Sequence, residues 1–309
     1  MQVLLDVILP VFMIIGLGYA AVWRELFTSE NIDALMKFAQ SFAIPFLLFK
    51  GMTEIDLEQS FQPGLLGSFY IGSITVFLLG ILGARWLFKR DWEECITIGF
   101  CCLFCNSLVL GLAITERAYG ANTLQGNFAI VTLHAPFCYG VGITAMEIAL
   151  NKGKNPIKLI KNVAVAMFKN ALVIAMIAGF IVNFYNISLP HTASVAIDMI
   201  VQVALPTALF GMGGVLYQYR TSGDIGPIIM ISIASLLLHP IFVLFLGTQF
   251  TLDTQGIRSA VLTSAMAPGI NAYIFSNMYQ RGQSVAASTV LLTTIGSVFT
   301  IWAWLKILP

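Results

Sequence analysis

The feature that most constrains this chain is a series of long apolar runs that contain no charged residue. Nine runs cover residues 7–23, 59–84, 95–115, 118–146, 170–197, 199–219, 225–252, 259–280 and 282–305, and a tenth, 32–49, contains two charges, Asp33 and Lys37. A membrane-spanning helix needs about 20 consecutive apolar residues. The pattern therefore predicts an all-α polytopic membrane protein with ten transmembrane helices in a lipid bilayer.

The scarcity of charge supports this fold class and excludes several others. Only 10% of the 309 residues are charged, and the net charge is +1. A soluble domain carries about 25% charged residues, so an ordinary soluble enzyme is excluded. The near-zero net charge gives no reason to expect a nucleic-acid partner. Outer-membrane barrels would show short alternating segments, and the sequence has none.

Lysine and arginine are distributed unevenly between the loops. Loops after odd-numbered spans hold ten of them, and the even loops with the C-terminal tail hold four. Cytoplasmic loops are enriched in these residues. We therefore expect the odd loops in the cytoplasm and both termini outside, in the plasma membrane or the bacterial inner membrane.

The chain repeats itself at an offset of 161 residues. Pairs at or near this spacing are Ala43 and Ala204, Pro45 and Pro206, Phe49 and Phe210, Gly18 and Gly179, and Tyr119 and Tyr279. Five spans per half force the second half to enter the membrane inverted, which is the plan of many secondary transporters. The predicted units are a first repeat at 1–150, a basic cytoplasmic linker at 151–165 and a second repeat at 166–309. Pro45 and Pro206 are predicted helix bends.

Two spans carry helix-breaking residues at equivalent places in the two halves. These are Asn106, Ser107 and Gly111 in the fourth span and Pro268, Gly269 and Asn271 in the ninth. Proline removes a helical hydrogen bond and glycine relaxes the backbone. Broken helices at such positions form substrate sites in inverted-repeat transporters, where helix N-termini face anions. The alternative is a pair of kinked packing helices.

At these residues the sequence resembles the auxin efflux carrier family, including bacterial members that transport organic acids such as malonate. The motifs are the A-[IL]-P-x3-F of both halves, NSLVLGL in the fourth span and APGINAYIFSNMY in the ninth. The resemblance implies a bile-acid-transporter-like fold, in which a scaffold of helices 1, 2, 6 and 7 holds a mobile unit of helices 3–5 and 8–10. It places a substrate carboxylate at the crossover of helices 4 and 9.

Two positions depart from that family's pattern. The family often has proline where this chain has Ala113, and bacterial members often have lysine where it has Ser235. The first departure predicts a less sharply broken fourth helix. The second predicts that a charge used for binding or coupling is absent.

Two titratable residues are candidates for coupling. His134 lies within a long uncharged span, and in plant members of the family a similarly placed residue is a polar cavity residue. Its alternatives are substrate or proton handling and a hydrogen-bonded packing role. Glu116 is either a second coupling group or a charge at the outer membrane interface.

Other residue patterns predict no cofactor and no metal site. Four of the five cysteines cluster in one apolar span and lack the second ligand pair of a zinc site, so we interpret them as buried packing residues. The motifs of common hydrolases are absent, so no enzyme is predicted. The sequence predicts a sodium-independent transporter of a small organic anion. A channel or a membrane sensor is the alternative, and a homodimer stays open.

Overall fold

The structure, a computed structural model, describes residues 4–56, 61–120, 123–150, 171–219 and 224–309. Within these ranges it is all-helical, and the only β-type contact is an isolated bridge between Cys105 and Pro268. The helices are α1 (Leu9–Trp23), α2 (Ser29–Phe38), α3 (Ile44–Glu54), α5 (Pro63–Leu87), α6 (Trp92–Leu103), α7 (Leu112–Tyr119), α8 (Gln125–Ala149), α10 (Ala171–Phe184), α11 (His191–Gln218), α12 (Ile225–Ile233), α13 (His239–Gln249), α14 (Thr254–Ser264), α15 (Ile270–Tyr279) and α16 (Gln283–Ile307).

Seven helical segments are long and apolar enough to cross a membrane. They are Leu5–Trp23, Ser29–Glu54, Pro63–Leu87, Gln125–Ala149, His191–Gln218, Ile225–Gln249 and Gln283–Ile307. The shorter apolar helix α10 follows residues 151–170, which the structure does not describe, so the predicted linker at 151–165 lies outside the described residues. The remaining apolar helices, α6 with α7 and α14 with α15, are interrupted halfway.

The predicted boundary between the sixth and seventh spans was wrong. Charge had placed it at Asp198, but the structure ends α10 at Phe184 and starts α11 at His191, directly after Pro190. Asp198 lies within α11, where one carboxylate oxygen is 2.5 Å from Nζ of Lys50. Lys50, which the loop count had placed outside, likewise lies within α3. Because the two charges form an ion pair, both can lie within helices, although each was taken from the sequence as the end of a span.

The fourth and fifth spans also meet elsewhere than expected. The charged pair Glu116 and Arg117 does not end the helix, because α7 continues to Tyr119. Gly120 then turns the chain with a φ of 89°, which is a left-handed conformation that favours glycine. The next helix begins at Gln125. Backbone conformation rather than charge therefore sets this boundary.

Several prolines lie at or within helices, and two of them follow a widened turn. A π-helical turn, Ala39–Ala43, precedes Pro45, and another, Ala234–Leu238, precedes Pro240. Proline has no backbone N–H and cannot donate the regular helical hydrogen bond, and the wider π-helical turn before it accommodates this loss. Pro206 lies inside α11, so both predicted bend prolines fall within the long helices.

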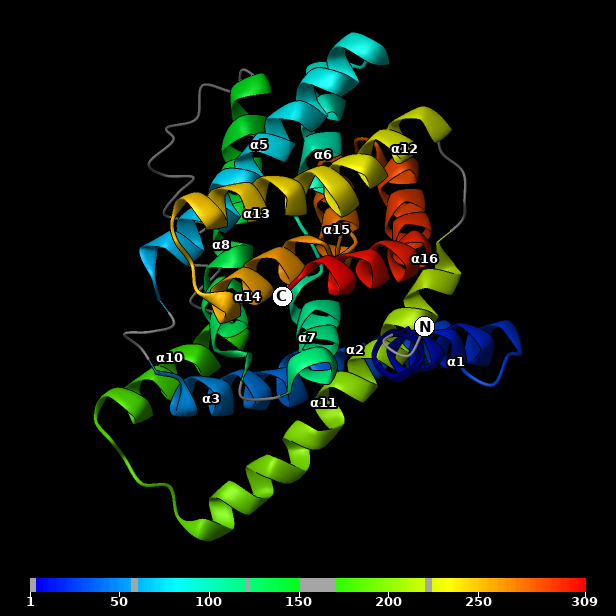
Figure 1. Ribbon diagram of the computed structural model, residues 1–309. Coiled ribbons are helices and arrows are strands. Elements are labelled where there is room, and N and C mark those ends of the chain that lie inside the picture. The colour runs from blue at the N-terminus through cyan, green and yellow to red at the C-terminus, as the bar shows by residue number, and fades with distance from the viewer. Residues whose placement is uncertain (1–3, 57–60, 121–122, 151–170, 220–223) are drawn as a thin grey trace.

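The helices form two layers. Figure 1 shows α1, α2, α3, α10 and α11 along one side of the molecule and the interrupted helices with α5, α8, α12, α13 and α16 on the other. In the first layer, α1 packs on α11 and α3 on α10. A Cβ on Gly18 would overlap the carbonyl oxygen of Phe210, and one on Gly179 would overlap that of Phe49. These two contacts are related by the offset of 161 residues found in the sequence.

The two ends of the molecule are held by different contacts of charged side chains. At one end Arg90 pairs with Asp224 at 2.7 Å and Arg281 pairs with Glu93 at 2.5 Å, and all four residues flank odd loops. At the other end, Arg117 donates to the carbonyl of Asp6 and Arg258 to that of Pro309. The helix ends at the fourth and eighth loops therefore lie beside the N-terminal segment and the C-terminus, as the alternation of spans requires.

Candidate functional site

The two interrupted helices cross at their unwound segments. The N–H of Asn106 donates to the carbonyl of Ala267 at 2.8 Å, and the N–H of Gly269 donates to that of Phe104 at 3.0 Å. These bonds form the antiparallel bridge centred on Cys105 and Pro268. Backbone groups freed from a helix inside a membrane must be paired or line a cavity. At the crossover, each unwound segment donates a backbone N–H to a carbonyl of the other segment.

Asn106 organises the restart of the fourth span. Its Oδ1 accepts the N–H of Val109 at 3.3 Å and caps a π-helical turn, Ser107–Gly111, that leads into α7. Its carbonyl accepts the N–H of Gly111 at 3.0 Å. Its Nδ2 lies 3.1 Å from Sδ of Met212 on α11. Because sulfur is a weak acceptor, this amide nitrogen keeps most of its capacity to bind a stronger acceptor.

Asn271 lies in the first turn of α15. Gly269 precedes that helix and provides no side-chain cap; the N–H of Ala272 donates to the carbonyl of Gly269, and the N–H groups of Ile270 and Asn271 lie at the uncapped start of the helix. Oδ1 of Asn271 accepts the hydroxyl of Tyr139 at 3.0 Å. The sequence analysis did not single out Tyr139, because this contact joins α8 to α15 across 132 residues.

His134 holds the crossover from the side of α8. Its Nε2 donates to the carbonyl of Cys105 at 3.1 Å, which is one of the groups freed by the break. The ring is buried between the rings of Phe69 and Phe104. Sγ of Cys138 lies 3.7 Å from Nδ1. His134 therefore stabilises unwound backbone, whatever further role it has.

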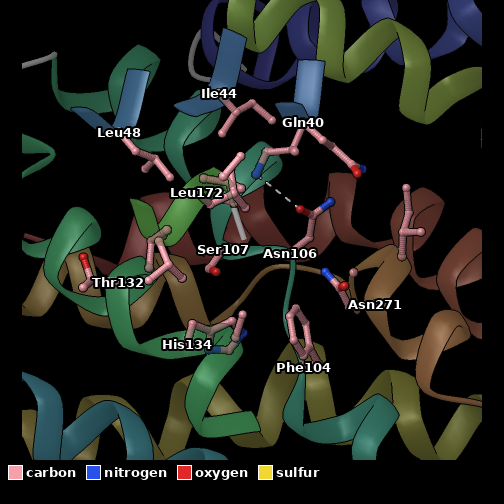
Figure 2. Close-up of a pocket in the computed structure, with 18 of the residues that line it drawn as sticks. Gln40, Ile44, Leu48, Phe104, Asn106, Ser107, Thr132, His134, Leu172 and Asn271 are labelled. Atoms are coloured by element: carbon pink, nitrogen blue, oxygen red, sulfur yellow. Dashed lines mark hydrogen bonds between the residues drawn. The ribbon is translucent and has the colours of Figure 1, made fainter. Parts of the chain in front are cut away.

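A cavity of about 330 Å³ opens beside the crossover. Figure 2 shows Asn106 and Asn271 at one side of it and Thr132 and His134 at the other, with Ser107 between them. Apolar side chains from α3, α10 and α11 form the opposite wall. The described lining includes no Asp, Glu, Lys or Arg. Its polar groups are neutral amides, hydroxyls, one imidazole and backbone.

The predicted site residues divide into two groups. Asn106, Ser107, Gly269, Asn271 and His134 line the cavity. Gly111 and Pro268 are buried in the crossover and are not part of the cavity lining. They act on backbone geometry instead.

Glu116 does not approach the cavity. It is exposed in the last turn of α7, next to the end of the molecule where Arg117 contacts the N-terminal segment.

The two departures from the family pattern have different surroundings. Ala113 lies in α7, beyond the break at 104–106, so that break forms without proline at this position. Ser235 is buried in the π-helical turn before Pro240, and its hydroxyl has no hydrogen-bond partner among the described residues.

The sequence analysis missed three polar residues that line the cavity: Gln40, Ser41 and Thr132. Gln40 and Ser41 lie in the π-helical turn of the second span. A glutamine in the middle of a predicted membrane span was a usable signal. Thr132 is two residues before His134, and nothing in its local sequence distinguishes it from a packing threonine.

Comparison with known proteins gives a consistent result. Residues 3–305 match the family described as membrane transport protein. A Rhizobium meliloti protein named "Putative malonate transporter" is 25% identical over 95% of this chain and 92% of its own length. The Escherichia coli K12 "Uncharacterized transporter YfdV" is 22% identical over 97% and 96%. "Auxin efflux carrier component 5" of Arabidopsis thaliana is 21% identical over 39% of this chain and 34% of its own length.

Proposed function

We propose that this chain, which belongs to the membrane transport protein family, is a secondary transporter that binds a small organic anion at the helix crossover and moves it by alternating access. The proposed substrate class is carboxylates. The family's proteins are transporters and not enzymes, and one relative is named for malonate. Our proposal extends the carboxylate class, and not malonate in particular, to this chain.

The observation that carries the proposal is the cavity beside the two unwound segments. Asn106 and Asn271 both line it, and each has its Oδ1 bonded to another protein group. The first turn of α15 also opens on it. Amide N–H groups and a helix N-terminus stabilise an anion. A lysine or arginine in this apolar cavity would be left unpaired whenever the anion dissociates, which costs free energy. A site built from neutral donors avoids that cost.

The ten-helix inverted repeat supplies the proposed mechanism. The seven long helices, α10 and the two interrupted helices together make ten. The paired contacts of Gly18 with Phe210 and Gly179 with Phe49 support an inverted relation between the halves. Asp91 and Asp253, which cap α6 and α14, occupy nearly equivalent places. Alternating access then follows from movement of helices 3–5 and 8–10 against the scaffold of helices 1, 2, 6 and 7.

The proposed orientation places both termini outside the cell or in the periplasm. It rests on the excess of lysine and arginine in odd loops. The contacts of Arg90 with Asp224 and of Arg281 with Glu93 support grouping those loops at one membrane face. A homodimer remains a prediction that the single chain does not address.

Coupling is proposed to be independent of sodium. Protein sodium sites use oxygen ligands, often carboxylates, and the described lining of the cavity contains no carboxylate side chain. His134 is the first proton-coupling candidate, because it lies on the cavity. Glu116, exposed at the end of α7, is the second. Membrane potential alone is a sufficient alternative, since about 100 mV contributes about 2.3 kcal/mol for each charge moved.

Counterflow in proteoliposomes tests the function. Vesicles preloaded with an unlabelled carboxylate should accumulate the same labelled carboxylate, and replacing sodium by choline at fixed pH and clamped potential should leave the rate unchanged. A channel would equilibrate the label without this trans-stimulation, and a sensor would bind without flux. Uptake of a cation or neutral sugar in place of every carboxylate would contradict the proposal, and loss of uptake in choline would contradict sodium independence.

A further inference from the structure

The polarity of the cavity depends on which way its two asparagine amides face. An amide presents an acceptor from its oxygen and two donors from its nitrogen. A backbone N–H can only donate, so the bond from Val109 fixes Oδ1 of Asn106 on the helix side. The Nδ2 of Asn106 is thereby directed away from the helix. Among the described residues, no backbone N–H donates to Oδ1 of Asn271, which accepts the hydroxyl of Tyr139 instead.

Tyr139 provides the equivalent constraint on Asn271. Its ring packs against Phe100, Phe104 and Phe275, and these aromatic surroundings offer its hydroxyl no strong acceptor. A hydroxyl in such surroundings needs a hydrogen-bond partner. Among the described residues that partner is Oδ1 of Asn271, at 3.0 Å. Figure 2 shows the amide nitrogen of Asn271 on the side that faces the crossover.

We infer that Tyr139 is a positioning residue that determines the specificity of the cavity: by holding Oδ1 of Asn271, it leaves only N–H donors of both asparagines facing the ligand. The inference rests on the proposed function, because it explains how a cavity without a cationic side chain in its described lining selects an anion. A neutral isostere that must also donate finds no acceptor on either asparagine. A carboxylate, which only accepts, is matched by both.

The variant Tyr139→Phe removes the hydroxyl and keeps the ring that packs on three phenylalanines. The Asn271 amide is then free to turn its oxygen toward the cavity. The lost restraint is one hydrogen bond, so affinity for a carboxylate should fall by about 2- to 12-fold. Affinity for the corresponding neutral amide should stay the same or rise. The maximal rate should change little, since Tyr139 does not line the cavity.

Tyr70→Phe is the matched control. Its hydroxyl donates to the carbonyl of Ile130 at 2.7 Å, and it too lies outside the cavity lining. This variant loses a hydroxyl bond of similar length and should show a similar loss of thermal stability with no change in selectivity. A stability effect alone is thereby separated from a specificity effect.

The experiment measures competition against labelled malonate and labelled butyrate by two matched neutral amides, malonamide and butyramide, in proteoliposomes. The inference predicts that Tyr139→Phe lowers the preference for carboxylate over amide, and that Tyr70→Phe keeps it. It also predicts that Asn271→Asp, which retains the bond to Tyr139, weakens carboxylate uptake more than Asn271→Ala does, because a carboxylate then faces the ligand.

Three results would contradict the inference. An unchanged carboxylate preference in Tyr139→Phe would overturn it while leaving the proposed function intact. Asn271→Asp binding carboxylates at least as well as Asn271→Ala would do the same. Failure of the wild-type protein to bind or transport any small carboxylate would overturn the proposed function and the inference together.

Discussion

Two regions of the molecule use glycine in opposite ways. One is the layer of α1, α2, α3, α10 and α11, which contains the proposed scaffold helices and which we call the scaffold, and the other is the helix crossover. At the contact of α1 with α11, a Cβ on Gly18 would overlap the backbone of Phe210. At the crossover, a Cβ on Gly269 would lie 3.5 Å from Cα of Asn106, which is ordinary contact, and its φ of −78° suits any residue. The scaffold therefore needs glycine for space, whereas the crossover does not.

This difference shows what holds each region together. The scaffold is fixed by backbone-to-backbone packing, which is how helices associate closely in a membrane. The crossover is held by a small number of hydrogen bonds. They come from the side chains of His134 and Asn106 and from the two backbone bonds that join the unwound segments. Such a region can change shape when one partner is exchanged for a ligand. We therefore expect substitutions in the scaffold to affect folding and those at the crossover to affect transport.

The largest effect is expected from Gly18→Ala. The added methyl overlaps a carbonyl that belongs to packed backbone and cannot rotate away, so the cost should reach about 3 kcal/mol, the upper end for overpacking. Gly16→Ala is the matched control on the same helix, since nothing lies within 4 Å of its Cβ. Thermal unfolding of both purified variants measures the difference. Equal stability would contradict the close contact.

The next largest effect is on affinity. Asn106→Ala and Asn271→Ala each remove a donor to a charged ligand, which should weaken binding by about 10- to 150-fold. Asn106→Ala should also destabilise the protein by about 1 kcal/mol, because it loses a helix cap, and Asn271→Ala should do so by about 1–3 kcal/mol, because it leaves the Tyr139 hydroxyl without its acceptor. Uptake kinetics and thermal unfolding separate the two effects. Near-normal affinity in both variants would remove the asparagines from the site.

A smaller effect is expected at His134, where two variants separate its structural and proton roles. His134→Leu removes the imidazole donor from the carbonyl of Cys105, which keeps only the N–H of Ser107, at a cost of about 1 kcal/mol for the lost hydrogen bond. His134→Gln keeps a donor and should retain stability. If the imidazole also carries the coupled proton, His134→Gln should flatten the pH dependence of uptake. An unchanged pH profile would remove the proton role and leave sodium independence standing.

The smallest effect is expected from Gly269→Ala. The new methyl makes only ordinary contacts, and alanine restricts the unfolded chain, so stability should change by less than about 1 kcal/mol. Uptake should be retained. A severe loss of folding here would show that the crossover is packed as tightly as the scaffold, which would undo the comparison.

The sequence predicted the location of the crossover well, because its signals are local. Asn106 and the Pro268-Gly269 pair announce breaks through their own backbone chemistry. Family membership was also predicted from these motifs, and the comparisons confirm it. The orientation of the Asn271 amide could not be predicted, because it depends on Tyr139, 132 residues away. Contacts of this kind are properties of the packed helices and leave no mark in nearby residues.

The predicted helix boundaries at Asp198 and Lys50 were wrong for a related reason. A charge was taken to end a span, yet Asp198 and Lys50 lie inside helices and neutralise each other across 148 residues. Gly111 and Pro268 were predicted to bind substrate, and that role stays a prediction; neither lines the cavity, and Pro268 takes part in the backbone bridge with Cys105. Sequence thus located the unusual backbone, and the structure was needed to separate residues that shape the site from residues that face it.

The most direct test of the account is substrate protection at the cavity wall. Thr132→Cys places a thiol on the cavity lining, and Thr28→Cys places one on the exposed loop before α2. Both are alkylated with a small maleimide, and peptide mass spectrometry follows each site with and without a carboxylate that the protein exchanges. We predict slower alkylation at position 132 and an unchanged rate at position 28. Equal rates at position 132 with and without the transported carboxylate would contradict binding at the crossover.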